Sequence, residues 1–215
     1  MGLDLVAGMK ILIPLILSLT VHEFAHAWTA WRLGDDTASR AGRLTLNPLA
    51  HIDPIGTVLL PLLGIPFGWA KPVPINPARF RRSIKMSTGV MLTAAAGPLS
   101  NVVLAVLCTV GFGLLLRFSP DFAVANVGIR ELLMIMIQLN VALAIFNMIP
   151  IPPLDGSRVL DGLMPLRFRP AWEGFTRFAP FLLLFVFIGA RYIMAGPMSA
   201  AFGLLDRILT VVVGA

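Results

Sequence analysis

Long apolar stretches separated by short polar loops dominate the sequence and predict helices that cross a membrane. The four clearest stretches cover residues 9–31, 88–116, 132–149 and 178–194. A helix needs roughly 20 apolar residues, with a range of about 17–25, to cross the hydrocarbon core of a bilayer. Polar side chains inside such a helix, such as Asn140 and Asn147, are expected to face the helix bundle.

Two further apolar stretches are not expected to form simple straight spans. Residues 198–213 contain Asp206 and Arg207, so this stretch is expected either to cross the membrane or to lie at its interface. Residues 55–70 are interrupted by prolines and glycines and are short for a span. They predict a re-entrant or broken element, which must be buried in protein or line a water-filled cavity.

Two short segments between the first two core helices are predicted to be extended. Residues 43–46 (RLTL) alternate as a short β-strand does, before Asn47 and Pro48 end the pattern. Residues 71–77 (KPVPINP) are rich in proline, which favours extended backbone. This second segment is expected either to pair with another strand through its free backbone groups or to serve as a plain connector.

The composition places the chain among integral membrane proteins. Hydrophobic residues make up 57% of the chain and charged residues 13%, and the mean hydropathy is +0.86; charged residues are about a quarter of an ordinary soluble domain. We therefore expect an all-α integral membrane protein, a multi-span helical bundle with a short β-strand or re-entrant element between the first two core helices. Its 215 residues are expected to form a single domain, 1–215.

The basic residues predict the orientation of this bundle rather than a nucleic-acid partner. The formal net charge is +6, but twelve of the 17 Lys and Arg residues lie in loops 32–53, 71–85 and 156–177. By the positive-inside rule these loops are expected on the cytoplasmic side of a plasma (inner) membrane, and the compact chain favours a prokaryotic one. The first and third spans then both run toward the cytoplasm, which brings residues 22–26 and Asp155 to a similar depth.

The candidate chemistry begins with His22, Glu23 and His26 in the first span. Residues four apart lie on one face of a helix, with Cβ atoms about 5–6 Å apart, so the two histidines can share one zinc ion. In this H-E-x-x-H pattern the glutamate acts as the general base of a zinc hydrolase. An ionisable cluster at membrane depth is costly unless it is paired or ligated, which favours a metal site over a chance pair of histidines.

A catalytic zinc site needs a third protein ligand and leaves a fourth position open. Asp155 is the predicted third ligand because the proline-stiffened segment before it reaches the depth of the histidines, whereas Asp161 lies further along a basic connection. Asp155 could instead cap the helix that follows. His51 and Asp53 could also serve the metal, although turn chemistry ahead of Pro54 explains both of them.

Together these residues predict hydrolysis of a peptide bond by an activated water. Zinc lowers the pKa of a bound water to about 7, and Glu23 would take its proton and later pass it to the leaving amine. Asn147 is predicted to donate a hydrogen bond to the oxyanion, and Asn101 could donate one to the site as well. A transmembrane helix used as substrate must unwind first, and strand addition to an extended segment could stabilise the unwound form.

Five short motifs follow one another between residues 20 and 160. They are His22-Glu-Phe-Ala-His26, Asn47-Pro-Leu-Ala-His-Ile-Asp-Pro-Ile-Gly56, Lys71-Pro-Val-Pro-Ile-Asn-Pro77, Ala96-Gly-Pro-Leu-Ser-Asn101 and Phe146-Asn-Met-Ile-Pro-Ile-Pro-Pro-Leu-Asp-Gly156. In this order they resemble the site-2 protease family of intramembrane zinc metalloproteases, in a minimal form without a PDZ or CBS domain.

This resemblance implies one zinc ion per chain and a set of site residues. The implied ligands are His22, His26 and Asp155, with Glu23 as general base and Asn147 in a substrate or oxyanion role. It also implies cleavage of membrane-spanning substrates near the cytosolic face. The expected partners are therefore single-span membrane proteins or peptides and the lipid bilayer, and no nucleic acid.

The main alternative function is a transmembrane metal-ion transporter, since clusters of histidine and carboxylate also mark ion pathways. A transporter is expected to carry polar residues along several spans and to show repeat symmetry, whereas here they gather at one depth. A third alternative is an inactive scaffold that binds membrane partners. The intact set of ligands and base argues against it.

Overall fold

The computed structural model describes residues 5–64 and 68–214, with side chains from residue 10 onward, and every regular element in this part of the chain is helical. Four of these helices are long and apolar enough to cross a membrane: α1 (Leu5–Arg32), α4 (Met86–Phe118), α6 (Val127–Asn147) and α9 (Ala179–Val213). At 1.5 Å per residue even α6, the shortest, is about 30 Å long and matches the hydrocarbon core. The predicted multi-pass helical bundle is confirmed.

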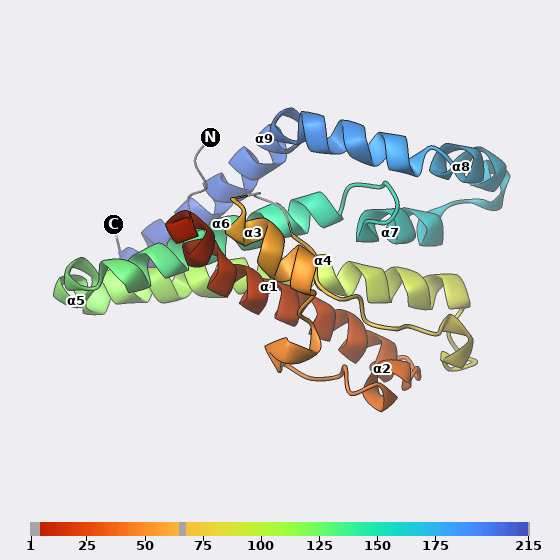
Figure 1. The fold of residues 1–215 in the computed structure, drawn as a ribbon, viewed down its shortest axis with the longest axis horizontal. Coiled ribbons are helices and arrows are strands. Elements are labelled where there is room, and N and C mark those ends of the chain that lie inside the picture. The colour runs from red at the N-terminus through yellow and green to blue at the C-terminus, as the bar shows by residue number, and fades with distance from the viewer. Residues whose placement is uncertain (1–4, 65–67, 215) are drawn as a thin grey trace.

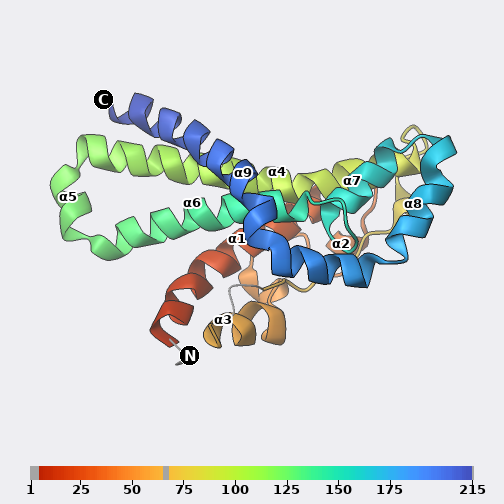
Figure 2. The same ribbon diagram turned by 90° about the horizontal axis from the view of Figure 1, so that it is seen from above.

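Helices α4 and α6 form a long antiparallel hairpin closed by α5 (Pro120–Ala125), and α1 packs across them (Figure 1). The short helices α7 (Asp155–Leu163) and α8 (Arg169–Thr176), with η4 (Leu166–Phe168) before α8, lie at the end opposite α5 (Figure 2). Gly97 and Ala105 of α4 are buried, and small residues let neighbouring helices approach closely. Helix α4 is therefore central and packs against α1, α6, α7 and α9.

The predicted β-strand at residues 43–46 is wrong, because this segment is an irregular loop between the short helices α2 (Thr37–Arg40) and η1 (Pro48–Ala50). Its neighbour is the extended segment 71–77, which ends in η3 (Pro77–Arg79). Three of the seven residues of 71–77 are prolines, which lack the N–H groups that a strand ladder needs. The Arg43 guanidinium instead donates to the carbonyl of Lys71.

Residues 54–64 form a broken helix, as predicted for part of the stretch 55–70. The π-helical η2 (Pro54–Leu59) continues into α3 (Leu60–Leu62), which ends before Gly64 at φ +74°. Both segments pack beside the N-terminal half of α1 (Figure 2). Residues 65–67 of the predicted stretch, Pro66 among them, lie outside the described residues.

The two predicted C-terminal stretches, 178–194 and 198–213, form the single helix α9 rather than two elements. Pro197 lies inside this helix and breaks one backbone hydrogen bond without ending it, because apolar residues on both sides continue the helix. The helix bends along its length (Figure 1). Its second half packs on α4 and α6 through a cluster that includes Ala105, Val141 and Leu205.

Candidate active site

Helix α1 places His22 and His26 one turn apart on the face that meets the bundle. Both residues are buried, with exposed fractions of 4% and 7%. Their ring centroids lie 4.6 Å apart in an edge-on arrangement, and their Nε2 atoms are 3.0 Å apart. This is the arrangement on one helix face that the four-residue spacing predicts.

Asp155 approaches both rings from the first residue of α7. The chain ends α6 at Asn147 and crosses a proline-rich segment that cannot continue the helix. Asp155 Oδ2 lies 3.1 Å from His22 Nε2 and 3.3 Å from His26 Nε2. Burial by itself raises the pKa of the Asp155 carboxyl, but the two imidazoles beside it lower this pKa below its usual range. The Asp155 carboxylate faces the histidines, and the N-cap of α7 is Leu154 instead.

When each imidazole is neutral, as a metal ligand must be, its hydrogen bonds decide which ring nitrogen carries the proton. His26 Nδ1 lies 2.7 Å from the backbone carbonyl oxygen of Thr93. A carbonyl oxygen can only accept, so His26 Nδ1 must donate. His26 Nε2 is then left with a free lone pair.

A chain of buried polar side chains fixes the proton of His22 in the same way. We call it the amide relay; it consists of the amides of Asn101 and Asn140 and the hydroxyl of Ser18. Asn140 Nδ2 donates to the carbonyl oxygen of Met136 at 2.8 Å and to Ser18 Oγ at 2.9 Å. Asn140 Oδ1 is therefore the atom that accepts from Asn101 Nδ2, at 2.7 Å. Asn101 Oδ1 in turn lies 2.6 Å from His22 Nδ1, which must donate to it. The relay joins α1, α4 and α6 behind one imidazole.

With both imidazoles neutral in these tautomers, three acceptor atoms converge: Nε2 of His22, Nε2 of His26 and Oδ2 of Asp155. Their separations are 3.0, 3.1 and 3.3 Å. Ligand atoms at about 2.0–2.1 Å from a tetrahedral zinc ion lie about 3.3–3.4 Å from one another. Buried acceptors repel one another unless a cation lies among them, so this donor set fits a zinc ion.

Gly97 of α4 provides the room in which the two imidazoles lie. A Cβ atom at this position would come within 2.4 Å of His26 Nε2 and 2.6 Å of His22 Cε1. Side-chain atoms do not approach ring atoms this closely without displacing them. A glycine is therefore required here by space.

Glu23 lies beside the histidines and is held by the extended segment 71–77. Its ligand atom is within 4.8 Å of those of His22 and His26. Its Oε2 accepts a 2.9 Å hydrogen bond from the backbone N–H of Val73. Asp155 lies nearer to both imidazoles, at 3.1 and 3.3 Å, so either carboxylate is close enough to be considered as a third ligand.

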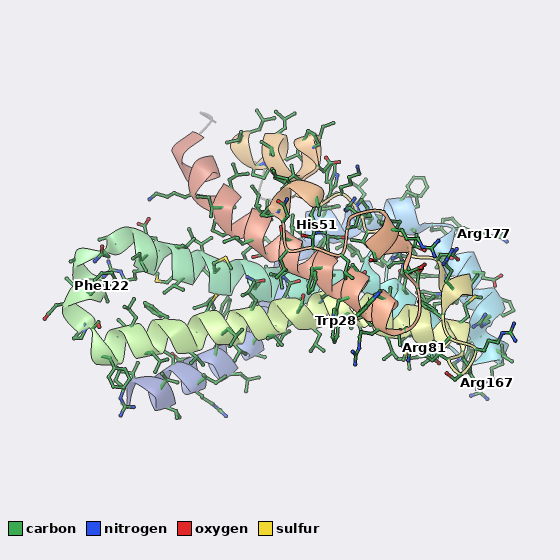
Figure 3. All side chains as sticks on the ribbon, turned by 90° about the horizontal axis from the view of Figure 1, so that it is seen from below. Trp28, His51, Arg81, Phe122, Arg167 and Arg177 are labelled. Atoms are coloured by element: carbon green, nitrogen blue, oxygen red, sulfur yellow. The ribbon has the colours of Figure 1, made fainter. Side chains whose placement is uncertain are left out.

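Asn147, Asp53 and His51 make their side-chain hydrogen bonds to other parts of the chain. Asn147 Nδ2 donates to the carbonyl oxygen of Leu143, one turn back on its own helix, at 3.1 Å. Asp53 accepts from two backbone N–H groups at the start of η2, which is the predicted turn chemistry. His51 donates through Nε2 to the carbonyl oxygen of Thr45 at 2.8 Å and lies in the loop beside α1 (Figure 3).

Sequence reasoning missed the roles of Ser18 and Thr93 and misjudged that of Asn101. Asn140 was predicted to face the bundle, and its fully buried side chain confirms this. Donation from Asn101 to the site was one possibility, but its oxygen accepts from His22 and its nitrogen donates to Asn140. A polar residue within an apolar span is a signal that it has a buried partner, but it does not identify that partner.

Replacing Asn101 with alanine should weaken zinc binding about 10–100-fold, the usual effect of losing a partner that orients a metal-bound histidine. Asn101→Asp keeps the oxygen that accepts from His22 and should recover part of this affinity. Zinc affinity is measured by competition with a coloured chelator. Asn126→Ala is the control, because the Asn126 side chain donates to the backbone carbonyl of Phe122 beside α5; equal affinities in all four proteins would contradict the orienting role.

Comparison with known proteins agrees with this chemistry. A family model described as peptidase family M50 matches residues 117–190, a stretch that contains Asp155 but not the paired histidines. Three relatives carry the name "Putative zinc metalloprotease". YwhC of Bacillus subtilis (strain 168) is 41% identical over 196 residues, which cover 88% of this chain and 86% of the relative.

The other two relatives are longer than this chain. Rip2 of Mycolicibacterium smegmatis is 37% identical over 68% of this chain and 54% of the relative. Rip2 of Mycobacterium tuberculosis (strain H37Rv) is 32% identical over 80% of this chain and 64% of the relative. No solved structure matches the chain.

Proposed function

Since the chain belongs to peptidase family M50, the site-2 protease family of intramembrane zinc metalloproteases, we propose that its zinc ion is held where His22, His26 and Asp155 converge. The protein is a zinc metalloprotease with several membrane-spanning helices, and the alternative of a metal-ion transporter has no support. The observation that supports the proposed site is the close approach of His22 Nε2, His26 Nε2 and Asp155 Oδ2, three atoms that can bind a metal, in a buried setting.

Zinc on two histidines and a carboxylate lowers the pKa of a coordinated water to about 7. Glu23, beside the ligands, would accept a proton from this water and pass it to the leaving amine. The N–H of Val73 keeps the Glu23 carboxylate turned toward the extended segment. For the predicted oxyanion role, Asn147 would have to exchange its present bond to the Leu143 carbonyl for one to the substrate.

The extended segment 71–77 is suited to hold an unwound substrate by strand addition. Lys71 and Val73 direct their N–H groups inward, to the His51 carbonyl and the Glu23 carboxylate. Successive residues of an extended chain point to opposite sides, so Pro72 and Pro74 direct their carbonyls outward with no N–H beside them. This edge can accept hydrogen bonds from the backbone of a substrate.

The proposed substrates are single-span membrane proteins, cut near the cytoplasmic face of a prokaryotic plasma membrane. Arg81, Arg167 and Arg177 lie at the end of the bundle that carries α7 and α8, and Phe122 lies at the opposite end (Figure 3). The positive-inside rule makes the arginine-rich end cytoplasmic. The broken helix 54–64, beside the N-terminal half of α1, would then be re-entrant.

The test is to incubate the purified full-length protein in detergent with single-span membrane proteins and to read product masses. We expect one main cut within or next to the transmembrane segment, loss of this cut with a zinc chelator, and its recovery when zinc is returned. A cut that is insensitive to the chelator, or no cut in any substrate, would disprove the proposal.

A further inference from the structure

A small cavity lies directly beside the proposed metal centre, between the extended segment 71–77, α4 and α7. Its volume is about 240 Å³. Its walls are mostly apolar and include Val73, Ile75, Val90 and Ala94, while Thr93 and Arg158 add polar groups. No residue proposed to bind zinc lines it, so it is a separate feature of the site.

Each of the three elements around the cavity also carries part of the catalytic site. On α4, the carbonyl of Thr93 accepts from His26. On the extended segment, the N–H of Val73 bonds to Glu23. On α7, Arg158 follows Asp155 by three residues, about one helical turn. The cavity is therefore bounded by the same three elements that carry or contact the proposed catalytic groups.

The size and position of the cavity fit one side chain of an extended substrate. Pockets for small molecules usually hold about 300–1,000 Å³, which is more than this cavity offers. An extended chain advances about 3.3 Å per residue, so a residue next to the scissile bond lies roughly one helical turn or less from the metal. Its side chain would reach the walls formed by Ile75 and Ala94.

The polar side chains that line the cavity can donate hydrogen bonds to an acceptor group of a ligand. Thr93 is 1% exposed, and its hydroxyl oxygen is buried without a hydrogen-bond partner. Buried hydroxyl groups in folded proteins are nearly always paired, so this hydroxyl, on a residue that lines the cavity, would gain a hydrogen bond by turning toward a ligand there. Arg158 is exposed and has no ion pair within the described part of the chain, and a guanidinium can only donate.

We propose that this cavity is the subsite for a substrate side chain next to the scissile bond, and that it selects side chains ending in a carboxylate or amide oxygen. The apolar walls take the methylene groups, and Thr93 and Arg158 bind the terminal oxygen. Glutamate and glutamine are therefore favoured over leucine, and lysine is disfavoured. This inference rests on the proposed protease function.

The test starts from a single-span substrate whose cut has been mapped by product masses. The residues on each side of the cut are changed in turn to Glu, Gln, Leu and Lys, and kcat/KM is measured with the full-length enzyme. At one position we expect Glu to exceed Lys by about tenfold, since an attraction is exchanged for a repulsion. Arg158→Glu should reverse this order, and Thr93→Val should remove the advantage of Gln over Leu.

Arg177→Glu makes the same change of charge at the end of α8 and should leave the preference as it is. Zinc content is measured for every variant, and Arg158→Gln, which should abolish the Glu-to-Lys preference, replaces Arg158→Glu if that protein does not fold. If the parent substrate is cut but its preferences are unchanged in the Arg158 and Thr93 variants, the subsite is disproved and the protease function stands. If no substrate is cut in a zinc-dependent way, both fail.

Discussion

Replacing Glu23 with glutamine is expected to lower kcat/KM by about 10²–10⁴-fold while one zinc ion per chain stays bound. Glutamine has nearly the same shape as glutamate, and its amide oxygen can still accept the N–H of Val73 that Glu23 binds at 2.9 Å. It cannot accept a proton from water at neutral pH. Cleavage of a single-span substrate is followed by product masses, and zinc is measured by elemental analysis.

Glu173→Gln is the matched control, because Glu173 lies on α8 and the same change there should alter neither quantity. A Glu23→Gln protein that cleaves at the normal rate would show that another group takes the proton. A protein that loses its zinc would place Glu23 among the ligands instead. Glu23 lies near enough to both histidines to act either as the general base or as a zinc ligand. The experiment distinguishes these two roles.

The membrane spans could be predicted because hydropathy depends on local sequence alone. The predicted strand at residues 43–46 failed for a reason that is not local. An alternating pattern needs a partner strand, and the neighbouring segment 71–77 has prolines where the ladder would need N–H donors. The division of α9 failed because a proline inside an apolar helix bends the helix more readily than it ends it.

The close approach of His22 and His26 could be predicted because helix periodicity alone sets their relation. The depth of Asp155 could be predicted from the distribution of charge, which places the ends of two spans on the same side. The amide relay could not be predicted, because the pairing of Asn101 with Asn140 depends on the rotation of α4 and α6 about their axes. Hydropathy does not report that rotation.

Replacing Asp155 with asparagine is expected to reduce zinc affinity by more than the 10–100-fold typical of losing an outer partner of a ligand. The amide keeps the size of the side chain but removes the negative charge that faces two lone pairs at 3.1 and 3.3 Å. Zinc per chain after dialysis should fall well below one. Zinc should also lose its effect on the melting temperature, since a ligand stabilises a protein only as far as it binds the folded state.

Asp161→Asn is the control for this change, because Asp161 lies on the same helix six residues further along and outside the cluster of acceptors. It should keep one zinc ion and full cleavage. If Asp155→Asn retained zinc with unchanged affinity, Glu23 would become the third ligand, and Glu23→Gln would then be the variant that loses the metal. The two substitutions together therefore show which carboxylate is the third ligand and which is the general base. The protein that keeps its zinc but loses its activity has lost the base, and the protein that loses its zinc has lost the ligand.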